Sequence, residues 1–197
     1  MDDIRIENIC KAYGDIEVFR DFSHCFPAGR ACCILGPSGS GKTTLLRMIA
    51  GLEMPDRGRI TPRPARISFV FQENRLFENL SAEKNVLLTA RHGFTRADAC
   101  ELLKALGLME DAQRHVSDFS GGMQRRTAIA RALAADYDLL LMDEPMAGLD
   151  GASRRQALEL IRESSRGRTL ICVTHDPADA GILGADILER MPPGSTR

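Results

Sequence analysis

Short runs of apolar residues alternate along the chain with segments of helical periodicity, which predicts an α/β protein. Runs that are apolar at every position indicate strands covered on both faces, as the strands of a parallel sheet are. Such strands are expected at Ala31–Leu35 and Leu139–Met142, and short, mainly apolar runs predict further strands at Ile67–Phe71, Thr169–Val173 and Ala185–Leu188. Looser alternation over Ile4–Ile9 and Ile16–Phe26 predicts two half-buried strands near the N-terminus.

Four segments have the pattern of helices, and they are Lys42–Ala50, Ser81–Leu108, Ser120–Ala135 and Ala152–Ser165. Within the second segment, Thr95 and Asp98 have the spacing of a capping box. The long helical stretch between Phe71 and Leu139 interrupts the alternation of strands and helices. It therefore indicates a helical insert on a mostly parallel α/β core within a single domain, residues 1–197.

Composition excludes several classes of protein. The 197 residues include 26 Lys and Arg against 27 Asp and Glu, a formal net charge of −1, so a nucleic-acid partner is not expected. No stretch approaches the roughly 18 apolar residues that span a bilayer, and no signal peptide is apparent, so a cytoplasmic protein is expected. The six cysteines form no CxxC pair and are expected to be reduced and buried. Residues 191–197 are expected to fray.

A glycine-rich sequence follows the strand at Ala31–Leu35 and opens the next helix. It matches G-x-x-x-x-G-K-[ST] at every fixed position, and the candidate phosphate-binding residues are Gly36, Pro37, Ser38, Gly39, Ser40, Gly41, Lys42, Thr43 and the following Thr44. Backbone N–H groups in such a loop, together with the helix N-terminus, bind phosphate oxygens. Lys42 is expected to reach the β- and γ-phosphates and Thr43 to bind Mg²⁺. A plain glycine-rich turn is the alternative interpretation.

Two carboxylates, Asp143 and Glu144, follow the apolar strand Leu139–Met142. A parallel strand delivers its C-terminal residues to the ligand-binding edge of the sheet. Asp143 is then placed to hold Mg²⁺ directly or through water, and Glu144 to polarise an attacking water. Two solvated acids would give the same pattern, but the phosphate loop favours the catalytic interpretation, and Glu144 favours hydrolysis over transfer to a hydroxyl group.

A second glycine-rich helix start lies at Ser120, Gly121 and Gly122. Glycines at a helix start are costly unless the backbone must approach something closely, and Ser120 can both cap the helix and donate to a phosphate. One nucleotide has little room for two such helix ends, so this one suits a nucleotide bound by another copy; a plain N-cap is the alternative. Further along the helix, a solvated or ion-paired face is expected for Arg125, Arg126 and Arg131.

Taken in order, these motifs resemble those of the ATPase subunits of ABC transporters over nearly the whole chain. The series is the phosphate loop, Gln72, Ser120-Gly-Gly, Asp143-Glu144, Asp150 and His175. The resemblance implies a P-loop NTPase core over about 1–75 and 136–190, with a small antiparallel N-terminal part. It implies a helical subdomain over about 76–135 that carries the signature motif. It also implies a head-to-tail dimer with ATP and Mg²⁺ between the two copies.

The resemblance further implies a role for each matching residue. Tyr13 matches the aromatic residue that stacks on adenine, and Val18 the apolar residue beside it. Gln72 matches the glutamine that contacts Mg²⁺ and the attacking water, Glu144 the catalytic base, and His175 the histidine that contacts the γ-phosphate. Contacts to ATP in trans would come from Ser120, Gly121, Gly122, Met123 and Asp150. Met123 stands where the family usually has Gln, and it cannot donate a hydrogen bond.

The implied function is ATP hydrolysis that powers an ABC transporter, most like bacterial importer subunits of the nitrate, sulfonate, taurine or thiamine type. The implied partners are a second copy, a transmembrane permease at the inner face of the cell membrane and, indirectly, a substrate-binding protein. Leu76, Phe77 and Leu80 would suit a groove for a permease helix, with internal packing as an equal alternative. The chain stops soon after the strand that follows His175, so no regulatory C-terminal domain is expected.

Other classes of P-loop protein are the alternatives. A P-loop kinase or a GTPase-like switch would account for Lys42 and Asp143 but not for Ser120-Gly-Gly or His175. ABC-type ATPases of DNA repair insert coiled coils or zinc modules before the signature motif, and the sequence has neither heptads nor CxxC pairs there. The motifs therefore favour transport.

Overall fold

The larger sheet of the computed structural model, which describes residues 2–190, is built from the predicted apolar runs. Its strands are β3 (Ala31–Leu35), β5 (Ile67–Val70), β6 (Leu139–Asp143), β7 (Thr169–Val173) and β8 (Asp186–Glu189). They lie in the order β5-β6-β7-β3-β8, with every neighbouring pair parallel. β6 and β7 are buried at all positions. This confirms the predicted parallel α/β core.

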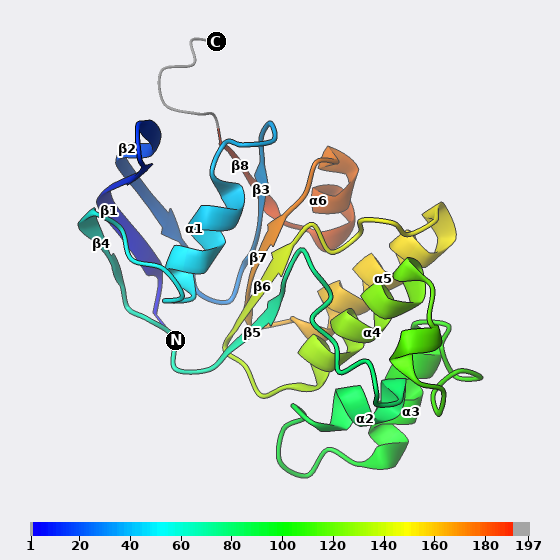
Figure 1. Cartoon of the computed structure of the whole chain (residues 1–197). Helices are drawn as coiled ribbons and strands as arrows, with labels where there is room; N and C mark the ends of the chain where they lie inside the picture. The colour runs from blue at the N-terminus through cyan, green and yellow to red at the C-terminus, as the bar shows by residue number, and fades with distance from the viewer. Residues whose placement is uncertain (1, 191–197) are drawn as a thin grey trace.

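A smaller antiparallel sheet packs beside it, as Figure 1 shows. It contains β1 (Ile4–Tyr13), β2 (Ile16–Phe26) and β4 (Arg57–Thr61), in the order β2-β1-β4. β4 was not predicted from the sequence, because Ile60 is its only buried residue and no alternation marks it. It forms a strand because it pairs with β1.

The helices cover both faces of the larger sheet (Figure 1). α1 (Lys42–Ile49) lies between the two sheets, and α4 (Gly121–Ala134), α5 (Gly151–Ser164) and α6 (Pro177–Leu183) lie on the opposite face. α2 (Ala82–Leu87) and α3 (Arg96–Ala105) pack against α4, with a 3-10 turn at Val116–Asp118. The single helical segment predicted over 81–108 is therefore two helices, separated by a stretch in which Gly93 has a φ of 80°.

Two smaller features of the helices bear on the sequence predictions. The capping box at Thr95 and Asp98 is confirmed at the start of α3. α6 was missed, although Asp176 caps it and Pro177 occupies its first turn, which is a recognised start signal. The boundaries of the helical subdomain, about 76–135, stay a prediction.

Alternating side chains of the central strands enter two separate cores, because successive residues of a strand point to opposite faces. Leu139 and Leu141 pack with α1 and the smaller sheet, whereas Leu140 and Met142 pack with the helices of the other face. This burial on both faces explains why the runs are apolar throughout. It also fixes the positions of the loops that leave the carboxyl ends of these strands.

All six cysteines are free. Cys32, Cys33 and Cys172 are buried, but Cys25 is exposed, so the prediction that all the cysteines are buried was wrong.

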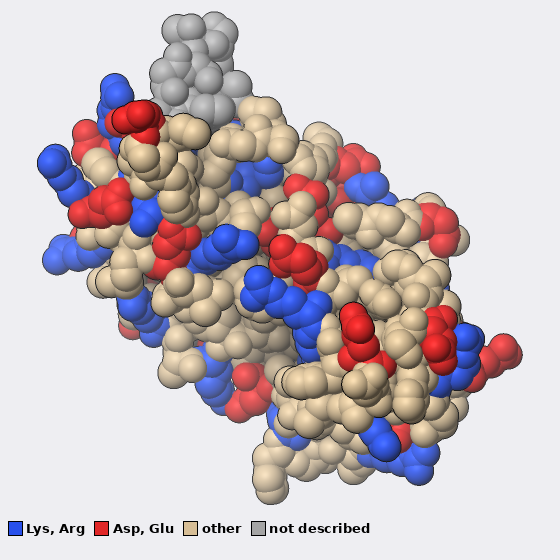
Figure 2. Space-filling view, in the orientation of Figure 1, with Lys and Arg blue, Asp and Glu red and all other residues tan. Residues whose placement is uncertain are grey.

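Among residues 2–190, no helix is both long and apolar enough to cross a bilayer. Basic and acidic side chains are interspersed on the face shown in Figure 2. The expected fraying of residues 191–197 concerns positions outside the described residues.

Candidate active site

The candidate catalytic segments meet at the carboxyl edge of the larger sheet. Gly36 follows β3, Asp143 ends β6, and Gln72 and His175 come two residues after β5 and β7. Asp143 is in register with Val173, so the ends of β6 and β7 are level. A cavity of about 210 Å³ lies at this edge and is lined by Val18, Ser38, Gly39, Gly41, Lys42, Thr43, Thr44, Gln72 and Glu144.

The glycine-rich loop folds around the ammonium group of its own lysine. Lys42 Nζ donates to the carbonyl oxygens of Gly36 and Pro37, both at 2.8 Å. Burial lowers the pKa of Lys42, and the nearby charges of Glu144 and Asp143 oppose that shift. Gly39 and Gly41 have φ values of 78° and 88°, which favour glycine. The loop thus presents a cation and the start of α1 to the cavity, as phosphate binding requires.

The carboxylate of Asp143 has the environment of a cation ligand. Asp143 is 2% exposed, and within residues 2–190 its Oδ1 has no hydrogen-bond partner. Burial raises the pKa of Asp143, against an opposing hydrogen bond from Thr43. Since a buried carboxylate oxygen without a partner is costly, this oxygen beside a hydroxyl group fits Mg²⁺, which prefers such oxygen ligands.

Glu144 and His175 form a direct pair. Glu144 Oε1 lies 2.5 Å from His175 Nε2. Glu144 has a φ of 49°, a left-handed conformation that costs about 1–2 kcal/mol for a residue with a side chain. Such strain is frequent at active sites, where the backbone conformation holds a side chain in the direction that the function requires.

Ion pairs with α5 hold the loop that contains His175. Arg154 of α5 donates at 2.8 Å to both Asp176 and the buried Asp179. Thr174 Oγ1 also donates to Asp179 Oδ2, at 2.5 Å. This network connects α5 to the histidine loop, and sequence analysis did not single it out.

The residues expected to act in trans lie outside the cavity within the described part of the chain. Ser120 caps α4 by accepting from the backbone N–H of Met123, at 3.3 Å. Asp150 caps α5, and hydrogen bonds from Ser153, then Ala152, hold its pKa below the usual range. Gly122 lies against the Asp150 loop, since a Cβ there would be 3.3 Å from the Gly148 oxygen. The two helix starts therefore form one surface, separate from the chain's own phosphate loop.

Tyr13 lies at the end of β1, beside the cavity. Its side chain is exposed (47%), its hydroxyl hydrogen-bonds Glu53, and Lys11 Nζ lies 5.3 Å from the ring centroid. Burial, and then the Glu53 contact, raises the pKa of Tyr13. Thr44, also in hydrogen-bond contact with Tyr13, connects the ring to the cavity lining. The exposed ring is available to stack on a base.

The prediction for the arginines of α4 was wrong at Arg125, which is 2% exposed and not solvated. Arg126 donates to the Leu106 oxygen at 2.8 Å, and Arg131 to the Arg75 oxygen at 2.7 Å. The spacing contained a signal, because Arg125 lies three and four positions before the buried residues Ala128 and Ile129, on the same helix face.

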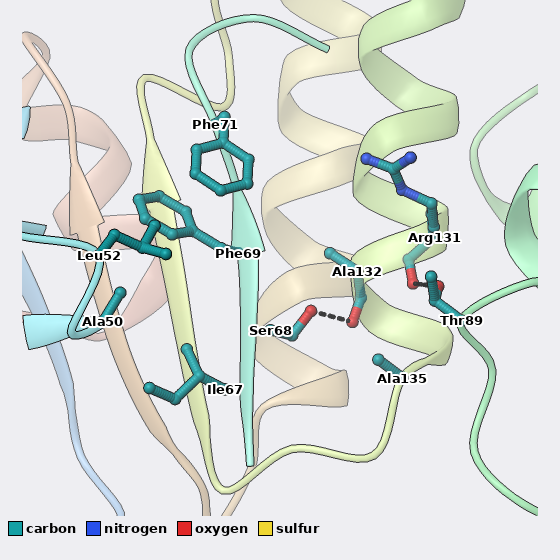
Figure 3. Close-up of a pocket in the computed structure, with 10 residues that line it drawn as sticks. All are labelled: Ala50, Leu52, Ile67, Ser68, Phe69, Phe71, Thr89, Arg131, Ala132 and Ala135. Carbon is teal, nitrogen blue, oxygen red and sulfur yellow. Dashed lines mark hydrogen bonds between the residues drawn. The ribbon is translucent and has the colours of Figure 1, made fainter. Parts of the chain in front are cut away.

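A second, apolar cavity of about 400 Å³ lies between the end of α1, β5 and α4, as Figure 3 shows. Its lining is Ala50, Leu52, Ile67, Ser68, Phe69, Phe71, Thr89, Arg131, Ala132 and Ala135. Phe69 and Phe71 stack with centroids 4.1 Å apart, and Phe71 directly precedes Gln72. We call this cavity the β5 groove.

Leu76, Phe77 and Leu80 do not line the β5 groove. Leu76 packs against the core, which supports the internal alternative at that position, whereas Phe77 is 54% exposed. The loop that carries them is anchored by buried Asn85, whose side chain bonds both the N–H and the carbonyl oxygen of Phe77.

Comparison with known proteins shows the family to which the chain is similar. A family model described as ABC transporter matches residues 19–147. The chain is 39% identical over 196 residues to the sulfate/thiosulfate import ATP-binding protein CysA 2 of Agrobacterium fabrum, covering 90% of this chain and 58% of that protein. It therefore spans a little over half the length of that relative.

Two further comparisons cover more of the related protein. The thiamine import ATP-binding protein ThiQ of Chelativorans sp. is 38% identical over 202 residues, covering 94% of this chain and 82% of that one. The solved dimeric structure of the ATP-binding cassette MJ0796 bound to ADP and Pi superposes with a TM-score of 0.83 at 30% identity, covering 95% of this chain and 94% of that one.

Proposed function

The chain belongs to the ABC transporter family of ATP-binding subunits, and from this premise we propose that it binds and hydrolyses ATP to power a bacterial importer of a small anion or nutrient. The main support for the proposal is the Glu144–His175 pair, whose Oε1 and Nε2 atoms lie 2.5 Å apart, beside a cavity lined by the phosphate loop. A kinase or GTPase-like switch would not need this pair. The import relatives for sulfate/thiosulfate and thiamine support the transport class.

ATP binding would begin at the phosphate loop. Lys42 Nζ would exchange its two carbonyl acceptors for β- and γ-phosphate oxygens, and the N–H groups of residues 38–43 would donate to the same phosphates. Tyr13 would stack on the adenine, with Val18 beside it. Thr43, Asp143 and Gln72 would hold Mg²⁺, which supplies charge neutralisation on the phosphates.

Hydrolysis would use the pair at the ends of β6 and β7. Glu144, which lines the cavity, would accept a proton from the water that attacks the γ-phosphate. His175 Nε2 now hydrogen-bonds Glu144 Oε1. With ATP bound, His175 would turn to the γ-phosphate and release the Glu144 carboxylate to the attacking water. Gln72 would orient the water from the loop after β5.

The complete site would need a second copy of the chain. Ser120, Gly121, Gly122, Met123 and Asp150 lie outside the chain's own cavity, and together they form a surface that contains two helix starts. In a head-to-tail dimer this surface would cover the partner's phosphates, with the N-terminus of α4 favouring negative charge. The dimeric cassette MJ0796 supports this arrangement.

We expect the permease partner to dock at the β5 groove, so that the chain would lie on the cytoplasmic side, peripheral at the inner face of the membrane. The groove is apolar and open, with Leu52 61% exposed, so an apolar helix surface would bury it favourably. It ends at Phe71, next to Gln72, so a helix seated there would touch the loop expected to contact the attacking water.

We expect Leu52→Glu to abolish copurification with a co-expressed permease subunit, because it places a charge in the apolar groove. Ile187→Glu is the matched control: Ile187 is 52% exposed on β8, at the opposite edge of the sheet from β5. Affinity purification from detergent extracts measures both variants against the unmodified chain. Equal recovery of permease with Leu52→Glu and with the unmodified chain would place the docking surface elsewhere.

The purified chain is expected to convert ATP to ADP and free phosphate without any added acceptor. Glu144 at the cavity activates water, whereas a kinase needs a substrate hydroxyl group. A phosphate-release assay with and without Mg²⁺ measures the activity. Absence of phosphate release, together with phosphorylation of an added acceptor, would favour the kinase alternative.

A further inference from the structure

A buried guanidinium group joins α4 to both loops that carry the expected catalytic side chains. Arg125 lies in the second turn of α4. Its donors reach five backbone carbonyl oxygens and the side-chain oxygen of Asn74. Because Arg125 bonds α4 to the loops that follow β5 and β6, its role goes beyond filling space in the core.

One set of bonds holds the loop that follows β5. Arg125 Nη1 donates to the carbonyl oxygens of Phe71, at 2.5 Å, and Gln72, at 3.2 Å. A longer contact of 3.4 Å reaches Asn74 Oδ1. With its carbonyl group held, the backbone of Gln72 has a fixed orientation, and so has the direction in which its side chain leaves the loop.

The other set holds the loop that follows β6. Arg125 Nη2 donates to the carbonyl oxygens of Asp143 and Glu144, both at 2.7 Å, and Nε donates to that of Pro145, at 3.0 Å. Glu144 is the residue with the left-handed backbone, so these bonds act where the chain is strained. They offset the cost of the conformation that aims Glu144 at His175.

Burying an arginine at this position costs free energy. Burial lowers the pKa of Arg125, because the charged group loses its contacts with water. An apolar side chain would pack on the same face of α4 as Ala128 and Ile129 without that cost. The planar guanidinium group of Arg125 can donate to several carbonyl oxygens at once, which a lysine ammonium group does less well. The hydrogen bonds therefore indicate that Arg125 orients the two loops rather than only packing in the core.

We propose that Arg125 is a positioning residue, which fixes the Gln72 loop and the Glu144 loop to the helix whose N-terminus faces the partner's nucleotide. The inference rests on the proposed function, since it assigns Gln72 and Glu144 their roles in hydrolysis. Arg125 itself would touch neither ATP nor water.

The kinetic test compares Arg125→Met and Arg125→Lys with Arg162→Met. Arg162 also donates to a backbone carbonyl oxygen, that of Ile182 at 3.3 Å, but it is exposed in the last turn of α5. We expect Arg125→Met to lower kcat at least tenfold while KM for ATP changes by less than threefold, with Arg125→Lys intermediate. An unchanged kcat in Arg125→Met, or an equal loss in Arg162→Met, would overturn the proposal.

A second measurement does not depend on activity and covers a variant that folds poorly. Hydrogen–deuterium exchange on the full chain should show faster exchange in peptides spanning 71–75 and 143–147 for both Arg125 variants, and not for Arg162→Met. Unchanged exchange in these peptides would overturn the proposal. If the unmodified chain fails to hydrolyse ATP, the proposed function fails, and the exchange result still decides the role of Arg125.

Discussion

Glu144→Gln is expected to lower ATP turnover by on the order of 100-fold or more, since a general base contributes about 10²–10⁴-fold to such a reaction. The amide keeps the shape of the side chain and a hydrogen-bonding group beside His175, but it cannot accept the proton of the attacking water. ATP binding should remain, because the phosphate loop is unchanged. Steady-state phosphate release and binding of a fluorescent ATP analogue measure the two effects.

Glu73→Gln is the matched control for this variant. Glu73 has an exposed carboxylate that pairs with Arg75 in the loop after β5, and it does not line the cavity. It should retain the turnover of the unmodified chain. If Glu144→Gln also retained it, the assignment of the base would be wrong.

Lys42→Met is expected to weaken ATP binding by about 100-fold, because a charge-assisted hydrogen bond contributes about 1.5–3 kcal/mol and about 1.4 kcal/mol corresponds to a factor of ten. The fold should survive. The variant removes a donor from the Gly36 and Pro37 carbonyl oxygens, but it also removes a buried charge, so we expect Tm to change by less than about 4 °C.

Titration calorimetry with ATP measures the affinity, and Lys104→Met is the control. Lys104 is an exposed lysine in the last turn of α3, so its loss should leave the affinity for ATP unchanged. ATP affinity within threefold of the unmodified chain in Lys42→Met would contradict the assignment of the phosphate loop.

The parts of the fold predicted from the sequence are those marked by local pattern. β6 and β7 are apolar at nearly every position because they are covered on both faces, and the phosphate loop follows β3 as its motif requires. The capping box at Thr95 and Asp98 is equally local. In each case a few neighbouring residues determine the structure, so a single sequence is sufficient.

The features that could not be predicted depend on contacts between distant segments. β4 has one buried residue and exists through its pairing with β1, some 50 positions earlier. The environment of Arg125 depends on acceptors 18 to 54 residues away. The sequence interpretation took its charge as a sign of exposure, whereas the burial of its helix neighbours would have indicated the opposite.

We propose that a complete nucleotide site needs two copies of the chain, and the mass of Glu144→Gln, measured by size-exclusion chromatography with light scattering, tests this directly. We expect the 21.7 kDa monomer to double in mass with ATP and Mg²⁺ and to stay monomeric with ADP.

Adding Gly121→Glu should prevent that dimer, because a Cβ at Gly121 meets nothing within 4 Å in its own chain while the carboxylate would face the partner's phosphates. Gly181→Glu, equally open but on α6, should leave the dimer intact. A Glu144→Gln protein that binds ATP and remains at the monomer mass would contradict the composite site.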